Sequence, residues 1–94
     1  MKQVLATDQA PAAIGPYSQG IAASETVYVS GQLPLDPATG AFPEGIAAQT
    51  AQSLKNIQAI LAQQGMTLAN VVKTTVFLAD INDFAEMNKV YGEF

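Results

Sequence analysis

Hydrophobic and polar positions alternate most regularly between residues 26 and 33. One set of alternate positions holds apolar residues and a glycine: Val27, Val29, Gly31 and Leu33. The other set holds Tyr28, Ser30 and Gln32. A period of two is typical of a strand with one buried face. Residues 17–23 also read as a strand, and only Ser24 and Glu25 separate the two, which predicts an antiparallel hairpin. The mildly apolar residues 2–7 predict a first strand.

A helical period follows a loop at residues 34–45 that is rich in proline and glycine. Positions three or four apart form one face: Ile46, Thr50, Leu54, Ile57 and Leu61, with Ile60 beside them. This spacing predicts an amphipathic helix, and Gly65 is a natural C-cap for it.

Residues 71–80 form the most strand-like stretch of the chain, because they are rich in β-branched residues and alternate in polarity. Asn82 and Asp83 then predict the start of a second helix, and the spacing of Asp83 and Glu86 matches a capping box. The predicted order is β-β-β-α-β-α. We expect an α+β fold in which a sheet carries two helices on one face.

The chain ends at Phe94, inside or at the end of the second predicted helix. In a sheet protein, the predicted strand at residues 71–80 and the helix after it are expected to be followed by a further strand of the sheet. The sequence therefore predicts one domain over residues 1–94, truncated at its C-terminus, with no room for a second core.

The composition indicates a globular protein, with 49% hydrophobic and 13% charged residues. So small a charged fraction favours an oligomer in which other copies cover part of the surface, although Ala, Gln and Thr can also supply a neutral polar surface. The net charge is −4, and the only basic residues are four scattered lysines: Lys2, Lys55, Lys73 and Lys89. Without a basic cluster, nucleic-acid binding is disfavoured.

The chain has no cysteine and no histidine. This excludes disulfides, a thiol nucleophile, thiolate metal sites and the usual proton shuttle. Asp80 and Asp83 flank a predicted helix start, where capping explains them better than metal ligation, so no metal site is predicted. The first residues lead into no long apolar stretch, so we expect no membrane span and a cytoplasmic protein.

Two hydroxyl residues lie beside glycine at a predicted strand and suggest a small-ligand pocket: Tyr17 after Gly15, and Ser30 before Gly31. Glycine inside a strand often marks the close approach of another group to the backbone. Two alternatives remain open at this point: the Tyr17 ring can anchor a loop in the core, and Gly31 can mark a bulge.

Phe84 and Asn88 lie four residues apart in the second predicted helix and therefore project to one side of it. An amide beside an apolar face is a candidate pocket group. The alternative is that Asn88 is a solvated asparagine.

Four stretches resemble the reactive-intermediate deaminase (Rid, or YjgF) family, in the family's order: AIGPYSQG at 13–20, VSGQLP at 29–34, VKTTVFL at 72–78 and DFAEMN at 83–88. The resemblance implies a chorismate-mutase-like fold and a homotrimer with sites in the clefts between subunits. It also implies hydrolysis of 2-imino and 2-enamino acids, released by pyridoxal-phosphate enzymes such as threonine dehydratase, to 2-keto acids and ammonia. No cofactor would be needed.

By the same resemblance, Tyr17 would contact the substrate and the Gly31 backbone would meet the imine nitrogen or keto oxygen. Ser30 would support that strand edge, while Phe84 and Asn88 would line the cleft. The family's Pro-Ala-Arg-Ser-like run, whose arginine would grip the substrate carboxylate, is absent from these 94 residues. So is its glutamate near the C-terminus, which would position the attacking water.

The catalytic residues therefore stay unassigned, and a molecule of these 94 residues alone is expected to be inactive. Two other functions remain open. One is a module of the same fold that binds a 2-keto acid without turnover. The other is the RNA cleavage ascribed to some relatives, which the net charge disfavours.

Overall fold

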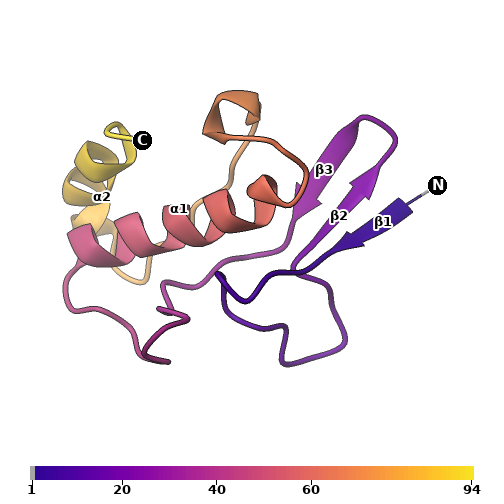
Figure 1. Cartoon of the computed structure of the whole chain (residues 1–94). Helices are drawn as coiled ribbons and strands as arrows, with labels where there is room; N and C mark the ends of the chain where they lie inside the picture. Colours follow the sequence, from indigo (N-terminus) through magenta and orange to yellow (C-terminus); the bar gives the residue numbers. More distant parts are fainter. Residues whose placement is uncertain (1) are drawn as a thin grey trace.

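Three short strands form one antiparallel sheet in the computed structural model, which describes residues 2–94 (Figure 1). The strands are β1 (Lys2–Leu5), β2 (Gly20–Ala23) and β3 (Thr26–Val29), in that spatial order. Ser24 takes a left-handed conformation (φ 55°) in the tight turn between β2 and β3. The predicted first strand and hairpin are therefore confirmed, although each strand is shorter than predicted.

The two faces of the sheet differ as the alternation predicts. Leu5 pairs with Gly20, which in turn pairs with Val29, so these three residues share the face that packs on the first helix. On the other face, Val4 and Tyr28 are 60% and 64% exposed. One face of this sheet therefore lacks a cover within residues 2–94.

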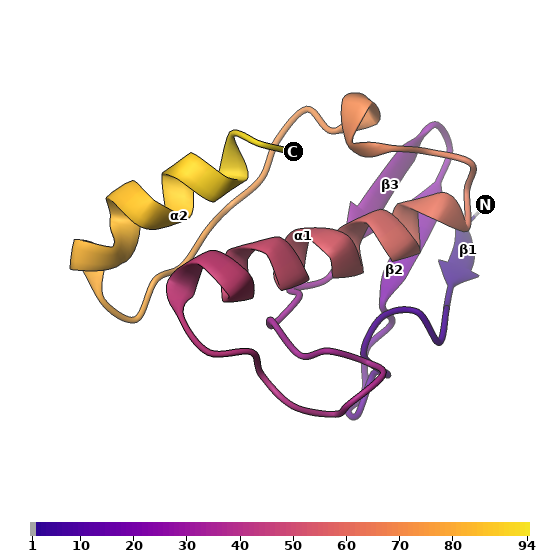
Figure 2. The ribbon, with the colours of Figure 1, turned by 60° about the vertical axis from the view of Figure 1, so that its left-hand side comes forward.

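Helix α1 (Ile46–Ala62) packs its C-terminal half on the inner face of the sheet (Figure 2). Ile60 is fully buried there in a small core with Leu5, Ala10 and Ala22. The predicted helix is confirmed, and Gly65 (φ 67°) turns the chain back after its end. No helix within residues 2–94 has both the length and the apolar character needed to cross a bilayer.

Helix α2 (Phe84–Tyr91) lies beside α1 at the end far from the sheet, and it buries Met87 (Figures 1 and 2). The predicted capping box at Asp83 and Glu86 is wrong, because the Asp83 side chain makes no capping hydrogen bond. A short 3₁₀ turn, η2 (Ile81–Asp83), precedes α2 instead. Asp80 caps it by accepting a hydrogen bond from the Asn82 backbone N–H at 2.9 Å.

The predicted strand at residues 71–80 is wrong for the described chain. After the 3₁₀ turn η1 (Leu68–Asn70), this segment runs past α1 as an irregular chain (Figure 2). Val72 is fully exposed and Phe77 is 91% exposed. A strand needs a neighbour to pair its backbone groups, and residues 2–94 supply none here. High β-propensity alone therefore does not make this segment a strand.

We predict that Gly20→Ala destabilises the protein by about 1–3 kcal/mol. A Cβ at residue 20 would lie 2.9 Å from Cγ2 of Ile60 and 3.3 Å from the Tyr28 carbonyl oxygen. Urea unfolding of both proteins measures the loss. The matched control is Gly31→Ala, where a Cβ meets nothing within 4 Å, so its stability should stay within about 0.5 kcal/mol or rise slightly. Equal losses in the two variants would contradict the packing described here.

We also predict that the backbone amides of residues 72–79 exchange with solvent hydrogen near the rate of an unprotected chain, because they have no hydrogen-bond partner within residues 2–94. The amides of Ile21 and Ala22, in the central strand, should be protected. Residue-resolved hydrogen exchange on the 94-residue chain makes the comparison. Equal protection of the two segments would show that residues 72–79 are paired in solution.

Candidate functional site

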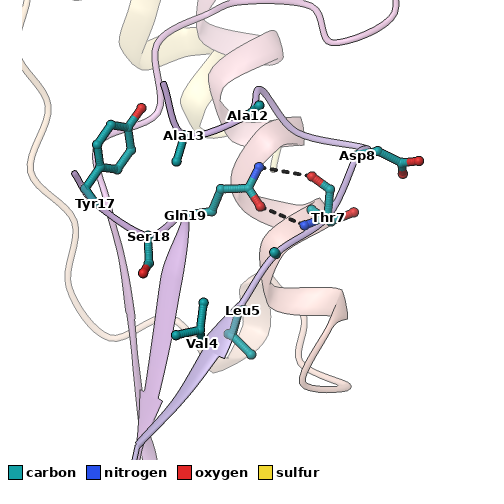
Figure 3. Close-up of a pocket in the computed structure, with 10 residues that line it drawn as sticks. Val4, Leu5, Thr7, Asp8, Ala12, Ala13, Tyr17, Ser18 and Gln19 are labelled. Carbon is teal, nitrogen blue, oxygen red and sulfur yellow. Dashed lines mark hydrogen bonds between the residues drawn. The ribbon is translucent and has the colours of Figure 1, made fainter. Parts of the chain in front are cut away.

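The loop of residues 6–19 carries Tyr17 between β1 and β2 and, with the end of β1, borders a shallow, open depression of about 500 Å³ (Figure 3). Tyr17 lies at this depression and is 50% exposed, so its ring is not a core anchor. Its backbone N–H donates to the Gly15 carbonyl at 2.8 Å, which gives the chain a tight bend there. The phenol group of Tyr17 is therefore held on a surface where a small molecule can reach it.

Ser30 fastens this loop to the end of β3. Its backbone N–H donates to the Gln19 carbonyl at 3.0 Å, and its hydroxyl donates to the Ser18 carbonyl at 2.5 Å. Two bonds thus tie Ser30 to the residues that directly follow Tyr17. The structure places Tyr17 and Ser30 in one connected region.

Gly31 directly follows Ser30 and lies outside the sheet. The strand predicted to reach residue 33 ends at Val29: the Ser30 N–H still bonds to the Gln19 carbonyl in the register of the hairpin, but no backbone pairing follows it. Gly31 is exposed, and neither its N–H nor its carbonyl is paired within residues 2–94. An unpaired donor and acceptor on an exposed glycine can bond to a ligand without a side chain in the way.

Phe84 and Asn88 do not join this region within one chain. Both are exposed on α2, with Phe84 at 52%. Helix α2 lies at the opposite end of the molecule from the loop of residues 6–19 in both views (Figures 1 and 2). The five predicted site residues therefore form two separate groups: Tyr17, Ser30 and Gly31 in one, and Phe84 and Asn88 in the other.

Two buried amides that the sequence did not predict lie next to the first group. Gln19 is 5% exposed and Asn56 is fully buried, and both donate to carbonyls of the loops around the site. No local pattern marked Asn56, because its burial depends on the loop of residues 33–35 that covers it. No periodic pattern marked Gln19, because it lies between the loop and β2.

The chemistry of the first group is that of binding and orientation. The groups free to bond to a small polar ligand are the Tyr17 phenol and the Gly31 peptide unit, since the Ser30 hydroxyl already donates to the Ser18 carbonyl. Asp8 is the charged residue that lines the depression. Within the described part of the chain, no three carboxylates gather closely enough to hold a metal ion.

Comparison with known proteins supplies the family. Residues 7–94 match the family described as Endoribonuclease L-PSP. A 2-iminobutanoate/2-iminopropanoate deaminase of Salmonella typhimurium is 50% identical over 94 residues, which are all of this chain and 73% of that protein.

Two solved structures share the fold, and this confirms the predicted fold class. The yjgF gene product of Escherichia coli is 47% identical with a TM-score of 0.94, over 97% of this chain and 72% of that one. Escherichia coli TdcF, solved with bound serine, is 42% identical with a TM-score of 0.94 over the same shares. A family match over nearly the whole chain, with relatives near half identity, shows that the chain belongs to the Endoribonuclease L-PSP family, the YjgF/Rid family.

Proposed function

We propose that this chain serves the hydrolytic deamination of 2-imino and 2-enamino acids to 2-keto acids and ammonia. The observation that carries the proposal is the unpaired Gly31 peptide, held beside the Tyr17 loop by the two hydrogen bonds of Ser30. A relative at 50% identity bears the name of such a deaminase, which supports the same chemistry here.

In this proposal, water adds to the imine carbon, the carbon–nitrogen bond then breaks, and ammonia leaves as the keto group forms. The Gly31 carbonyl accepts a hydrogen bond from the imine N–H, and the Gly31 N–H donates to the oxygen that develops at the same carbon. The Tyr17 hydroxyl orients the substrate. These groups hold the reacting atoms in place, which is a large part of catalysis for a reaction of two molecules.

The proposal includes a homotrimer in which Phe84 and Asn88 of one subunit line the cleft that holds Tyr17 and Gly31 of its neighbour. Three features support it: the open outer face of the sheet, the exposed apolar side chains of residues 71–80, and the low charged fraction. The homotrimer also explains why the two groups of site residues lie far apart in one chain, since a second copy can bring its Phe84 and Asn88 to the Tyr17 and Gly31 of the first.

A second candidate function is a module that binds a small carboxylate, such as a 2-keto acid, without turnover. The specific observation in its favour is that TdcF, at 42% identity, was solved with bound serine, an amino acid of similar size. The 94 residues contain no arginine to grip a carboxylate bidentately, which counts against carboxylate binding by these residues alone. RNA as a substrate is less favoured, because the net charge is −4 and the four lysines are scattered along the sequence.

We predict that the protein expressed from its complete gene accelerates the release of 2-ketobutyrate when it is added to threonine dehydratase and threonine. The dehydratase makes the 2-amino-enoic acid, and faster hydrolysis of that product appears as faster keto-acid formation. Absence of acceleration, with tight binding of 2-ketobutyrate by calorimetry, would favour the non-catalytic module. Degradation of RNA by the pure protein, lost on a substitution at Tyr17 or Gly31, would favour the nuclease.

We predict that Tyr17→Phe lowers kcat/KM for the imine about 10-fold, the equivalent of one hydrogen bond of about 1.4 kcal/mol. Thermal unfolding should be unchanged, because the lost hydroxyl belongs to a half-exposed side chain. Tyr28→Phe is the matched control, since it removes the same atom from a tyrosine on the outer face of the sheet. Equal effects of the two substitutions would argue against a role of Tyr17 at the substrate.

A further inference from the structure

Three buried polar residues lie within residues 2–94: Gln19, Thr50 and Asn56. Thr50 bonds only inside its own helix, where its hydroxyl donates to the Ile46 carbonyl at 2.7 Å. Gln19 and Asn56 instead bond to loops that are distant in sequence. A buried amide with partners outside its own element fixes the position of those partners, because breaking the bonds leaves unpaired groups in the interior.

Gln19 holds the first half of the loop that carries Tyr17. Its Oε1 accepts from the Thr7 N–H at 2.7 Å, and its Nε2 donates to the Thr7 carbonyl at 3.0 Å (Figure 3). The same nitrogen lies 2.7 Å from the Pro11 carbonyl oxygen and 3.3 Å from that of Ala10. One side chain therefore closes the loop from residue 7 to residue 11 against the start of β2.

Asn56 holds the segment that follows Gly31. Its Nδ2 donates to the Leu33 carbonyl at 3.1 Å and to the Leu35 carbonyl at 3.0 Å. Its Oδ1 accepts from Nε2 of Gln52, one turn earlier in α1, at 2.9 Å. Both amide hydrogens of a fully buried side chain thus go to a chain segment that has no strand or helix of its own to fix it.

The two amides fix the chain on either side of Gly31 without contacting it. On the N-terminal side, Ser30 bonds to the carbonyls of Ser18 and Gln19, and the Gln19 side chain anchors that part of the chain to the loop before it. On the C-terminal side, Asn56 fixes Leu33, two residues after Gly31. The unpaired Gly31 peptide therefore lies between two residues, Ser30 and Leu33, whose positions are fixed by hydrogen bonds.

We infer that Gln19 and Asn56 are positioning residues, which set the geometry between the Tyr17 hydroxyl and the Gly31 peptide without touching the substrate. The inference rests on the proposed function for its catalytic consequence. Only a side-chain amide suits either position. A carboxylate would place acceptors against carbonyl oxygens, and a hydroxyl has one hydrogen where at least two carbonyls require donors.

The experiment replaces each amide by an apolar residue of similar size, Gln19→Met and Asn56→Leu, and also by the matching acid, Gln19→Glu and Asn56→Asp. Thr50→Val is the matched control, because it removes a buried polar group that bonds only within α1. Imine turnover is measured in the coupled assay at a temperature where circular dichroism shows each variant folded. We expect kcat/KM to fall about 10- to 100-fold in the amide variants and to change less than about 2-fold in Thr50→Val.

A double-mutant cycle separates positioning from loss of stability. Tyr17→Phe should cost less in the Gln19→Met protein than in the natural protein, because the hydroxyl is already displaced there. Additive effects, or an equal loss of turnover in Thr50→Val, would overturn the inference. If Gln19→Met does not fold, the same cycle of Tyr17→Phe with Asn56→Leu provides the comparison.

Hydrogen exchange tests the anchoring without any assay of turnover. Gln19→Met should speed exchange at the Thr7 and Ser30 amides, and Thr50→Val should leave both unchanged. Unchanged exchange at both amides in Gln19→Met would overturn the inference. If the natural protein has no deaminase activity but the amides respond as expected, the proposed function fails while the anchoring stands.

Discussion

The side-chain amide of Gln19 is the interaction on which the rest of this small structure depends. With 94 residues the core is limited to a few apolar side chains around Ile60, and the longest loops must be held by other means. Loop carbonyls that leave water need hydrogen-bond donors, and no strand or helix supplies them there. Gln19 and Asn56 supply those donors from the interior. The same bonds that stabilise the loops also place Tyr17 and Gly31.

This arrangement explains why the groups proposed to bind the substrate lie at the end of a strand and not within it. Beyond Val29 one further backbone bond in the hairpin register joins Ser30 to Gln19, and the Ser30 hydroxyl bonds to the Ser18 carbonyl. The next peptide, at Gly31, has no partner within residues 2–94. A strand that continued would have used those backbone groups in a ladder and left none for a ligand.

The helices and the hairpin could be predicted because their signals are local. The apolar spacing from Ile46 to Leu61 predicts a helix, and the two-residue turn at Ser24 and Glu25 predicts a hairpin. Each signal depends only on residues close together in the sequence. The segment at residues 71–80 shows the limit of such signals. Its alternation of Val, Thr and Phe suits a strand, but pairing requires a neighbour that local pattern does not reveal. Asp83 does lie at the N-cap position of α2, but it has helical backbone angles and makes no capping bond, while Asp80 caps the 3₁₀ turn before it.

By itself, the sequence determined the element types of α1, α2 and the hairpin, and it carried the family resemblance. The absence of histidine, cysteine and arginine from the 94 residues also excluded the chemistry that needs those side chains within them. Tertiary structure alone decided which predicted site residues meet. It brought Tyr17, Ser30 and Gly31 into one region through the hydrogen bonds of Ser30 to Ser18 and Gln19, and it left Phe84 and Asn88 at the other end of the molecule. It also revealed Gln19 and Asn56, because the burial of an amide depends on distant segments that no local pattern records.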